Sequence, residues 1–166
     1  MISFFRRPDV ELLVLCRANI CRSPAGEALL RAALDKRGLG RRVRVRSAGI
    51  AVGMPGSPPD ARMVAVAAEL GVKMKRLRAK PLTPQLLSAA TTVYVTELAQ
   101  REAVEEMLPE AADRVVPLDT AGEDIPDPYY GDRLGIRRTF ERLQEIAEAR
   151  AEEWQQHLAA ADRMPR

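Results

Sequence analysis

The sequence predicts an α/β fold, a three-layer α/β/α sandwich around a central four-stranded parallel sheet, built by a single domain over residues 1–166. Strand-like and helix-like patterns alternate along the chain, as expected for right-handed β-α-β units. The first apolar run, residues 10–15 (VELLVL), is almost continuous, which is typical of a strand covered on both faces. No linker, repeat or low-complexity tract divides the 166 residues, a length that suits one domain with a buried core.

The first helix and the second strand follow this run. Ser23 at the cap and Pro24 in the first turn predict a helix that ends at Gly38. Residues 42–47 predict a second strand, and their alternating arginine and valine suit a half-exposed edge of the sheet. Residues 49–59 contain three glycines and three prolines, so we expect a loop there.

The rest of the chain continues the alternation of helices and strands. The patterns predict a helix over residues 60–70, a short helix from 81 through 88, a strand over 91–96, a helix over 97–108, a strand over 114–118, a loop over 119–133 and a long amphipathic helix over 134–158. In parallel sheets of this kind, ligands bind at the carboxyl ends of the strands. The residues after the first strand are therefore the first candidates for a functional site.

A cysteine and an arginine flank the loop after the first strand, in the segment CRANICRS that begins at Cys16. In a strand–loop–helix turn the backbone N–H groups converge, and the helix N-terminus adds partial positive charge. Such a site stabilises a thiolate at Cys16 and can hold a phosphate, onto which Arg22 can donate two N–H groups. The spacing alone occurs by chance, but the preceding strand and the helix start at Ser23 favour a cysteine nucleophile over a buried structural cysteine.

The other residues of this loop are expected to bind the substrate or to support the loop. Asn19 lies mid-loop, where its side chain can brace the backbone turn. Ser23 can donate its hydroxyl to the Cys16 sulfur and so stabilise the thiolate. The substrate-binding residues predicted here are Arg17, Ala18, Asn19, Ile20, Cys21 and Ser23.

Phosphoryl transfer to a thiolate also needs a general acid that protonates the leaving group. Asp127 lies between two prolines, which restrict its backbone and so the direction of its carboxylate. A rigid turn is the plainer interpretation, but Tyr129 and Tyr130 can wall a pocket for an aromatic substrate. Asp119 and Asp124, in the same predicted loop, are competing candidates for the acid.

Composition and charge point to a cytoplasmic globular protein that needs no cofactor. The net charge is +3, and the basic clusters at residues 41–46 and 73–78 suit solvated faces better than nucleic-acid or membrane binding. No apolar run approaches the roughly 20 residues of a membrane span, and the N-terminus lacks the apolar stretch of a secretory signal. Both cysteines lie in the loop and the single histidine, His157, lies in a polar helix, so no metal site is expected.

Three motifs together resemble the low-molecular-weight protein tyrosine phosphatases: CRANICRSP from Cys16, SAG at residues 47–49 and DPYYG at residues 127–131. The resemblance extends from about residue 10 to the C-terminal helix. It implies that Cys16 attacks phosphorus, that Arg22 holds the phosphoryl group, and that Asp127 is the general acid and then the base that hydrolyses the cysteinyl-phosphate. It also implies that Cys21 could form a reversible disulfide with Cys16; a small loop-packing residue is the other interpretation.

The chain departs from the family pattern at two places. Ala18 stands where the family usually has glycine, so the loop backbone there must tolerate a Cβ. Residues 50–59 contain no aromatic residue, whereas the family commonly has one there, as the second wall of the phosphotyrosine slot; Gly53 or Met54 takes that position. The resemblance implies a phosphorylated protein or a small phosphomonoester as substrate, with inorganic phosphate released from the loop.

A protein-arginine phosphatase of the same fold is the closest alternative, and residues 80–118 resemble that branch at least as well. By resemblance, a threonine before the second cysteine favours phosphoarginine and an isoleucine favours phosphotyrosine. Ile20 therefore indicates the tyrosine enzyme, since an apolar side chain suits an aromatic ring. A thioredoxin-coupled arsenate reductase is disfavoured, because it would need cysteines outside the loop and this chain has none there. A catalytically inactive phosphate-binding module is also disfavoured, because it would be expected to lose Cys16, Arg22 or Asp127, and all three are present.

Overall fold

The structure is a computed structural model that describes residues 7–164. Four strands form one sheet in the order β2-β1-β3-β4, and every neighbouring pair is parallel. The strands are β1 (Val10–Cys16), β2 (Val43–Gly49), β3 (Thr92–Val95) and β4 (Val115–Pro117). Most of the N-terminal segment for which the sequence predicts no secretory signal, residues 1–6, lies outside the described residues.

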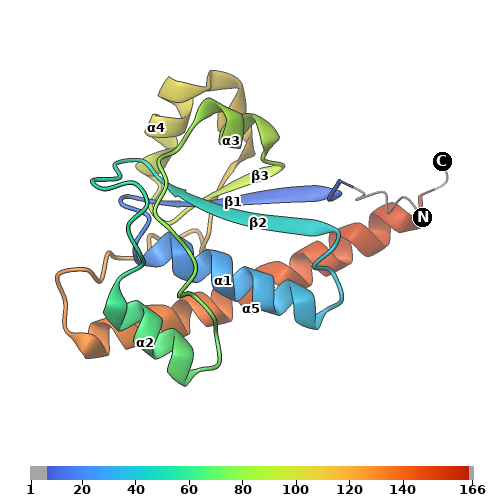
Figure 1. Cartoon of the computed structure of the whole chain (residues 1–166). Helices are drawn as coiled ribbons and strands as arrows, with labels where there is room; N and C mark the ends of the chain where they lie inside the picture. The colour runs from blue at the N-terminus through green and yellow to red at the C-terminus, as the bar shows by residue number, and fades with distance from the viewer. Residues whose placement is uncertain (1–6, 165–166) are drawn as a thin grey trace, which may run out of the picture.

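Helices cover both faces of the sheet (Figure 1). On one face lie α1 (Arg22–Lys36), α2 (Ala61–Glu69) and α5 (Arg133–Asp162). On the other lie α3 (Pro84–Ala89) and α4 (Gln100–Met107), which a 3₁₀ helix, η1 (Pro109–Arg114), follows. The predicted three-layer α/β/α sandwich with a four-stranded parallel sheet is thus confirmed. Within residues 7–164, no helix combines the length and the apolar character that a membrane-spanning segment needs.

The side chains of β1 alternate between two hydrophobic cores, because successive residues of a strand point to opposite faces. Leu12 and Val14 pack in the larger core, with α1, α2 and α5. Leu13 and Leu15 pack in the smaller core, under α3 and α4. β1 is therefore buried on both faces, as its continuous apolar run predicts, and this holds its carboxyl end rigidly in the centre of the molecule.

Several helix starts differ from the sequence prediction. α3 begins at Pro84 and not at residue 81, and α4 begins at Gln100 and not at residue 97. Ser23 does not cap α1: the helix begins at Arg22, and its cap residue, Cys21, makes no side-chain capping bond. The reason is that the Ser23 hydroxyl is turned back toward the loop, where it contacts Cys16. The long helix α5 begins at Arg133, because the Asp132 carboxylate accepts a hydrogen bond from Gly135 N at 2.8 Å and caps it.

Candidate active site

The loop between β1 and α1, residues 16–22, is here called the phosphate-binding loop. It begins at Cys16, the last residue of β1, which lies opposite Gly49 in the parallel register with β2. The chain after β2 runs along this loop: Ile50 N donates to Cys16 O at 3.1 Å, and Ala51 N donates to Arg17 O at 2.8 Å. A Cβ on Gly49 would lie 2.8 Å from Arg17 O, so only glycine permits this close approach.

Asn19 holds the loop in shape through its side chain. Its φ of 55° is the only positive value at a non-glycine residue within the described chain, so Ala18 needs no left-handed backbone and its Cβ is tolerated. The Asn19 amide donates to Ser23 Oγ at 2.8 Å and to Ser47 Oγ at 3.0 Å. Its carbonyl oxygen accepts from Lys80 N at 3.0 Å. Three partners, two of them 28 and 61 positions away in sequence, therefore hold one strained residue.

Ser23 lies directly behind the thiol, with its Oγ 3.0 Å from Cys16 Sγ. Ser23 Oγ accepts a hydrogen bond from Asn19, and its own O–H has two acceptors in reach, the sulfur at 3.0 Å and Ala48 O at 3.4 Å. The hydroxyl can therefore donate to the sulfur. Cys16 and Ser23 are both buried. A hydroxyl donor at this distance, inside the protein, stabilises a thiolate more than it does a neutral thiol.

The hydrogen-bond chain behind the loop ends on a buried carboxylate. Ser47, which accepts from Asn19, donates to Glu27 Oε2 at 2.5 Å. The Glu27 side chain is 2% exposed and is paired with Arg31 at 2.6 Å. Hydrogen bonds through Ser23, Asn19 and Ser47 therefore link the Cys16 thiol to the Glu27–Arg31 ion pair on α1. Each of these bonds restricts the conformation of the side chains that it joins.

Arg22 closes the phosphate-binding loop with a side chain that is 1% exposed. Its Nη1 donates to the carboxylate of Glu97 and to Ile125 O, the latter at 2.8 Å. Its Nη2 lies 3.3 Å from Asp127 Oδ2. Its Nε is buried and has no hydrogen-bond partner among the described residues. A buried N–H without an acceptor is costly, so an oxyanion in the loop is the partner that this nitrogen can take.

Of the three candidate acids, Asp127 is the one at the loop. Its Oδ1 accepts from Tyr129 N at 3.1 Å, and its Oδ2 faces Arg22. Asp119 is held elsewhere by Arg142, at 2.6 Å. Asp124 accepts from Leu98 N at 2.7 Å. Neither of these two lines the cavity over the loop, whereas Asp127 does.

A cavity of about 210 Å³ opens over the phosphate-binding loop. It is lined by Cys16, Arg17, Ala18, Ile20, Cys21, Arg22, Asp127, Tyr129 and Tyr130. Asn19 and Ser23, the other predicted site residues, do not line it, because they lie buried behind the loop. At the mouth, the rings of Tyr129 and Tyr130 meet edge to face with centroids 5.0 Å apart.

Cys21 differs from Cys16 in its surroundings. Burial raises the pKa of its thiol, and the nearby carboxylates of Asp60 and Asp127 raise it further. Both cysteines are free thiols in this structure. Cys21 therefore stays protonated near neutral pH, and the two thiols of the loop are not chemically equivalent.

Three residues that support the phosphate-binding loop or the segment after Asp127 are not signalled by the sequence analysis: Glu97, Asp60 and Arg62. Glu97, which binds Arg22, lies two residues beyond the end of β3, and the rule that ligands meet strand carboxyl ends could have pointed to it. Arg62, at the start of α2, contacts the segment that follows Asp127, and Asp60 binds Arg62 and the phosphate-binding loop; no local pattern signals these contacts. No group of three or more His, Cys, Asp or Glu residues within 7–164 is placed to hold a metal ion.

A thiol, a converging backbone loop and a buried arginine at the carboxyl end of the first parallel strand define a cysteine-dependent phosphatase site. The comparison with known families agrees. Residues 11–163 match the family described as low molecular weight phosphotyrosine protein phosphatase, and the chain belongs to this family, whose members are hydrolases.

Relatives and solved structures support this assignment. The chain is 34% identical over 139 residues to the probable low molecular weight protein-tyrosine-phosphatase EpsP of Ralstonia nicotianae, covering 83% of this chain and 91% of the relative. It is 31% identical over 151 residues to the low molecular weight protein-tyrosine-phosphatase Etp of Escherichia coli K12, covering 90% of this chain and 95% of the relative. Among solved structures, it is similar to Vibrio vulnificus Wzb in complex with benzylphosphonate, with a TM-score of 0.80, 32% identity and coverage of 87% and 98%.

The fold is also shared with an arginine-specific enzyme. The YwlE arginine phosphatase from Geobacillus stearothermophilus is similar with a TM-score of 0.81 and 26% identity, covering 95% of this chain and 99% of that one. The fold therefore does not distinguish between the two substrate classes, and the residues of the cavity must be considered.

Proposed function

We propose that the protein hydrolyses phosphotyrosine through a cysteinyl-phosphate intermediate, with Cys16 as nucleophile, Arg22 as phosphate ligand and Asp127 as general acid and base. The observation that supports it most is that the thiol, the guanidinium and the carboxylate line one cavity of about 210 Å³. The cavity suits a single phosphoryl group and the ring that carries it. Its substrate would be a phosphorylated protein or a small phosphomonoester.

In the first step the Cys16 thiolate attacks phosphorus. The S–P bond forms as the P–O bond to the phenol breaks, and Asp127 transfers its proton to the leaving oxygen. The backbone N–H groups of the loop and the Arg22 Nε and Nη2 bind the equatorial oxygens, where charge is spread in the transition state. Arg22 Nη1 is already held by Ile125 O, so the guanidinium is oriented before the substrate arrives.

In the second step a water molecule hydrolyses the cysteinyl-phosphate. Asp127, now a carboxylate, takes a proton from the water as its oxygen attacks phosphorus, and the S–P bond breaks. The electron pair returns to sulfur, and the hydroxyl of Ser23, 3.0 Å away, stabilises the thiolate that leaves. Inorganic phosphate is the product. The cycle regenerates every group and uses no cofactor.

The preference for phosphotyrosine rests on the apolar and aromatic part of the cavity. Ile20 offers no hydroxyl to a guanidinium, and Tyr129 and Tyr130 offer faces against which a phenyl ring can pack. The relatives named above as protein-tyrosine-phosphatases, and the benzylphosphonate bound to Wzb, support the same preference. The likeness to the arginine phosphatase makes phosphoarginine the second candidate.

The decisive experiment compares hydrolysis of phosphotyrosine and phosphoarginine peptides by the wild type and by Ile20→Thr. We expect the wild type to prefer phosphotyrosine, and the Ile20→Thr variant to lose part of that preference. Met107→Thr, an apolar-to-threonine change at a half-exposed position on α4, is the matched control and should leave the ratio unchanged. A wild-type preference for phosphoarginine would contradict the tyrosine assignment.

The wider predictions from the sequence accompany this proposal. We infer that residues 1–166 form one domain, which the family match over residues 11–163 supports. A cytoplasmic location, the lack of a metal or cofactor, and the lack of nucleic-acid and membrane partners stay predictions from composition. Localisation of the tagged protein in cells and activity after exhaustive chelation would test them.

A further inference from the structure

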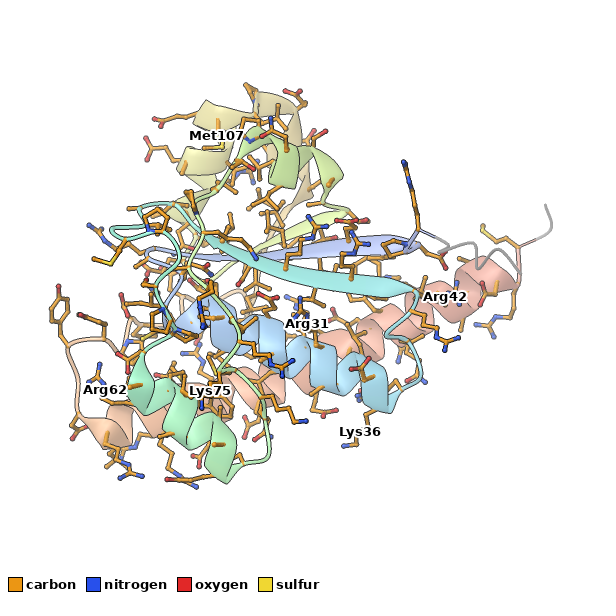
Figure 2. All side chains as sticks on the ribbon, in the orientation of Figure 1. Arg31, Lys36, Arg42, Arg62, Lys75 and Met107 are labelled. Atoms are coloured by element: carbon orange, nitrogen blue, oxygen red, sulfur yellow. The ribbon has the colours of Figure 1, made fainter. Side chains whose placement is uncertain are left out.

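Arg62, in the first turn of α2, lies beside the segment that leads into α5 (Figure 2). That segment, residues 127–131, is here called the acid segment because it begins with Asp127. We propose that Arg62 is a positioning residue for the general acid: it ties the acid segment to the phosphate-binding loop and so sets how well Asp127 protonates the leaving group. The inference rests on the proposed function and adds to it a residue that does not line the cavity.

On one side, the Arg62 guanidinium binds the backbone of the acid segment. Its Nη2 donates to Tyr129 O at 2.7 Å, and its Nη1 donates to Gly131 O at 2.9 Å. The guanidinium carbon lies 5.9 Å from the centre of the Tyr129 ring, at the outer limit of a cation–π contact. Arg62 therefore fixes the backbone at Tyr129 and Gly131, beyond the Asp127–Pro128 pair, where proline no longer restricts the chain.

On the other side, the same guanidinium is held by Asp60. Its Nε and Nη2 donate to the two carboxylate oxygens at 3.1 and 2.8 Å, a bidentate pair. Asp60 also caps α2 through Arg62 N, at 2.9 Å, and its side chain is 8% exposed. The hydrogen bond from Arg62 lowers the pKa of the Asp60 carboxyl, which stays charged.

Asp60 connects this pair to the phosphate-binding loop. Its backbone N donates to Ile20 O at 2.8 Å. Four hydrogen bonds thus connect Ile20 to Gly131 through two intermediate residues, Asp60 and Arg62. They join residues up to 69 positions apart in sequence. A displacement of α2 would move the acid segment together with the loop that binds the phosphate.

Asp127 needs such support because its carboxylate is 37% exposed and lies at the open side of the cavity. It faces Arg22 at 3.3 Å and closes a turn onto Tyr129 N at 3.1 Å, the residue whose carbonyl Arg62 binds. A displacement of about 1 Å at a catalytic group costs up to roughly 100-fold in rate. Lysine cannot replace this arginine, because a single ammonium cannot span two carbonyls and a carboxylate with the same geometry.

The test measures kcat/KM of the full chain for phenyl phosphate, a poor leaving group, and for 4-nitrophenyl phosphate, a good one. Only the poor leaving group depends strongly on proton donation. For Arg62→Met we expect a loss of about 10- to 100-fold with phenyl phosphate and less than about threefold with 4-nitrophenyl phosphate. Inhibition by inorganic phosphate should change by less than about twofold, since the phosphate-binding loop stays intact.

Arg62→Lys is the second variant, and it should not restore the loss with phenyl phosphate. Because lysine keeps a positive charge beside Asp60, this variant should fold, and its kinetics test the inference even if Arg62→Met does not fold. Arg137→Met is the matched control: Arg137 also joins α5 to α2, at 2.7 Å from Glu69, but it does not contact the acid segment. It should leave both substrates unaffected.

Two results would overturn the inference: equal losses for both substrates, which indicate a structural role only, or wild-type behaviour of Arg62→Lys. Asp127→Ala, measured in parallel, separates this inference from the proposed function. If Asp127→Ala shows the leaving-group dependence and the Arg62 variants do not, the positioning role is wrong and the function stands. If Asp127→Ala lacks that dependence as well, the assignment of the acid itself is wrong.

Discussion

The carboxylate of Glu97 binds Nη1 of Arg22, so the arginine of the phosphate-binding loop is oriented by an acid two residues beyond the end of β3. Arg22 is almost completely buried, and Ile125 O accepts from the same nitrogen. With Nη1 occupied, Nε and Nη2 form the edge of the guanidinium that can meet a phosphoryl group. Of these two nitrogens, Nη2 lies 3.3 Å from Asp127 Oδ2 and Nε has no hydrogen-bond partner among the described residues. A buried cation held at Nη1, with Nε still able to donate, is suited to bind an oxyanion without reorganising.

Glu97→Ala should lower kcat/KM, because the Arg22 guanidinium loses its counterion and part of its orientation. We expect a loss of about tenfold or more, and a smaller one for Glu97→Gln, whose amide oxygen can still accept from Nη1. The measurement is steady-state hydrolysis of 4-nitrophenyl phosphate. Glu102→Ala, on the exposed side of α4, serves as the control. Undiminished activity in Glu97→Ala would show that the ion pair does not orient the arginine.

Cys16→Ser should abolish turnover, whereas Cys21→Ser should keep most of it, although the two thiols lie in one loop. The physical reason is that Cys16 has the Ser23 hydroxyl at 3.0 Å, while the pKa of Cys21 is raised by burial and by two carboxylates. Binding of inorganic phosphate, followed by calorimetry, should persist in Cys16→Ser because the loop is retained. Comparable loss in both variants would contradict the assignment of a single nucleophile.

Ser23→Ala should slow both the formation and the breakdown of the cysteinyl-phosphate, because the sulfur loses its hydroxyl donor. We expect about 100-fold lower kcat, by analogy with removal of one oxyanion-hole donor, and slower alkylation of Cys16 by iodoacetate. Peptide mass mapping after a timed reaction measures the alkylation. Ser88→Ala, at an exposed position on α3, is the matched control. Unchanged alkylation would show that Ser23 does not stabilise the thiolate.

Cys21 should make folding less favourable at alkaline pH. Because its pKa is raised in the folded state, the folded chain keeps a proton that the unfolded chain loses above about pH 8.5. The contribution of Cys21 to stability is thus fully present below pH 8.5 and falls as pH rises, by up to about 1.4 kcal/mol per pH unit. Urea unfolding at pH 7, 9 and 10 should show the difference in free energy between wild type and Cys21→Ser shifting in favour of the variant. A difference independent of pH would contradict the shift.

Gly49→Ala should destabilise the protein and reduce its activity together, because the added Cβ would lie 2.8 Å from Arg17 O and 3.0 Å from the carbonyl carbon of Ala18. These are backbone atoms of the phosphate-binding loop and cannot move without distorting it. We expect a loss of about 1–3 kcal/mol in the free energy of unfolding. Gly53→Ala is the control, since no atom lies within 4 Å of its Cβ position. Thermal unfolding and kcat/KM should separate the two variants.

Local sequence patterns were sufficient for the layers, the parallel sheet and the place of the phosphate-binding loop. Hydrophobic periodicity and turn residues act over a few positions, and a strand that must be buried on both faces shows this in its own composition. The carboxyl end of such a strand is where Cys16 lies, so the strand pattern and the motif pointed to the same site. The sequence pattern favours Asp127 as the acid, but it does not exclude Asp119 and Asp124.

Only the tertiary structure decided which side chains meet. It left Ser23, predicted both as a helix cap and as a partner of Cys16, with only the second of these contacts. It also directed Asp119 toward Arg142 instead of the cavity, and brought Glu97 and Arg62 to residues 69 to 75 positions away. These contacts depend on how α2, α5 and the carboxyl end of β3 pack against one loop. That packing results from the burial of many apolar side chains in two hydrophobic cores. These side chains come from the whole chain, so no short stretch of sequence predicts it.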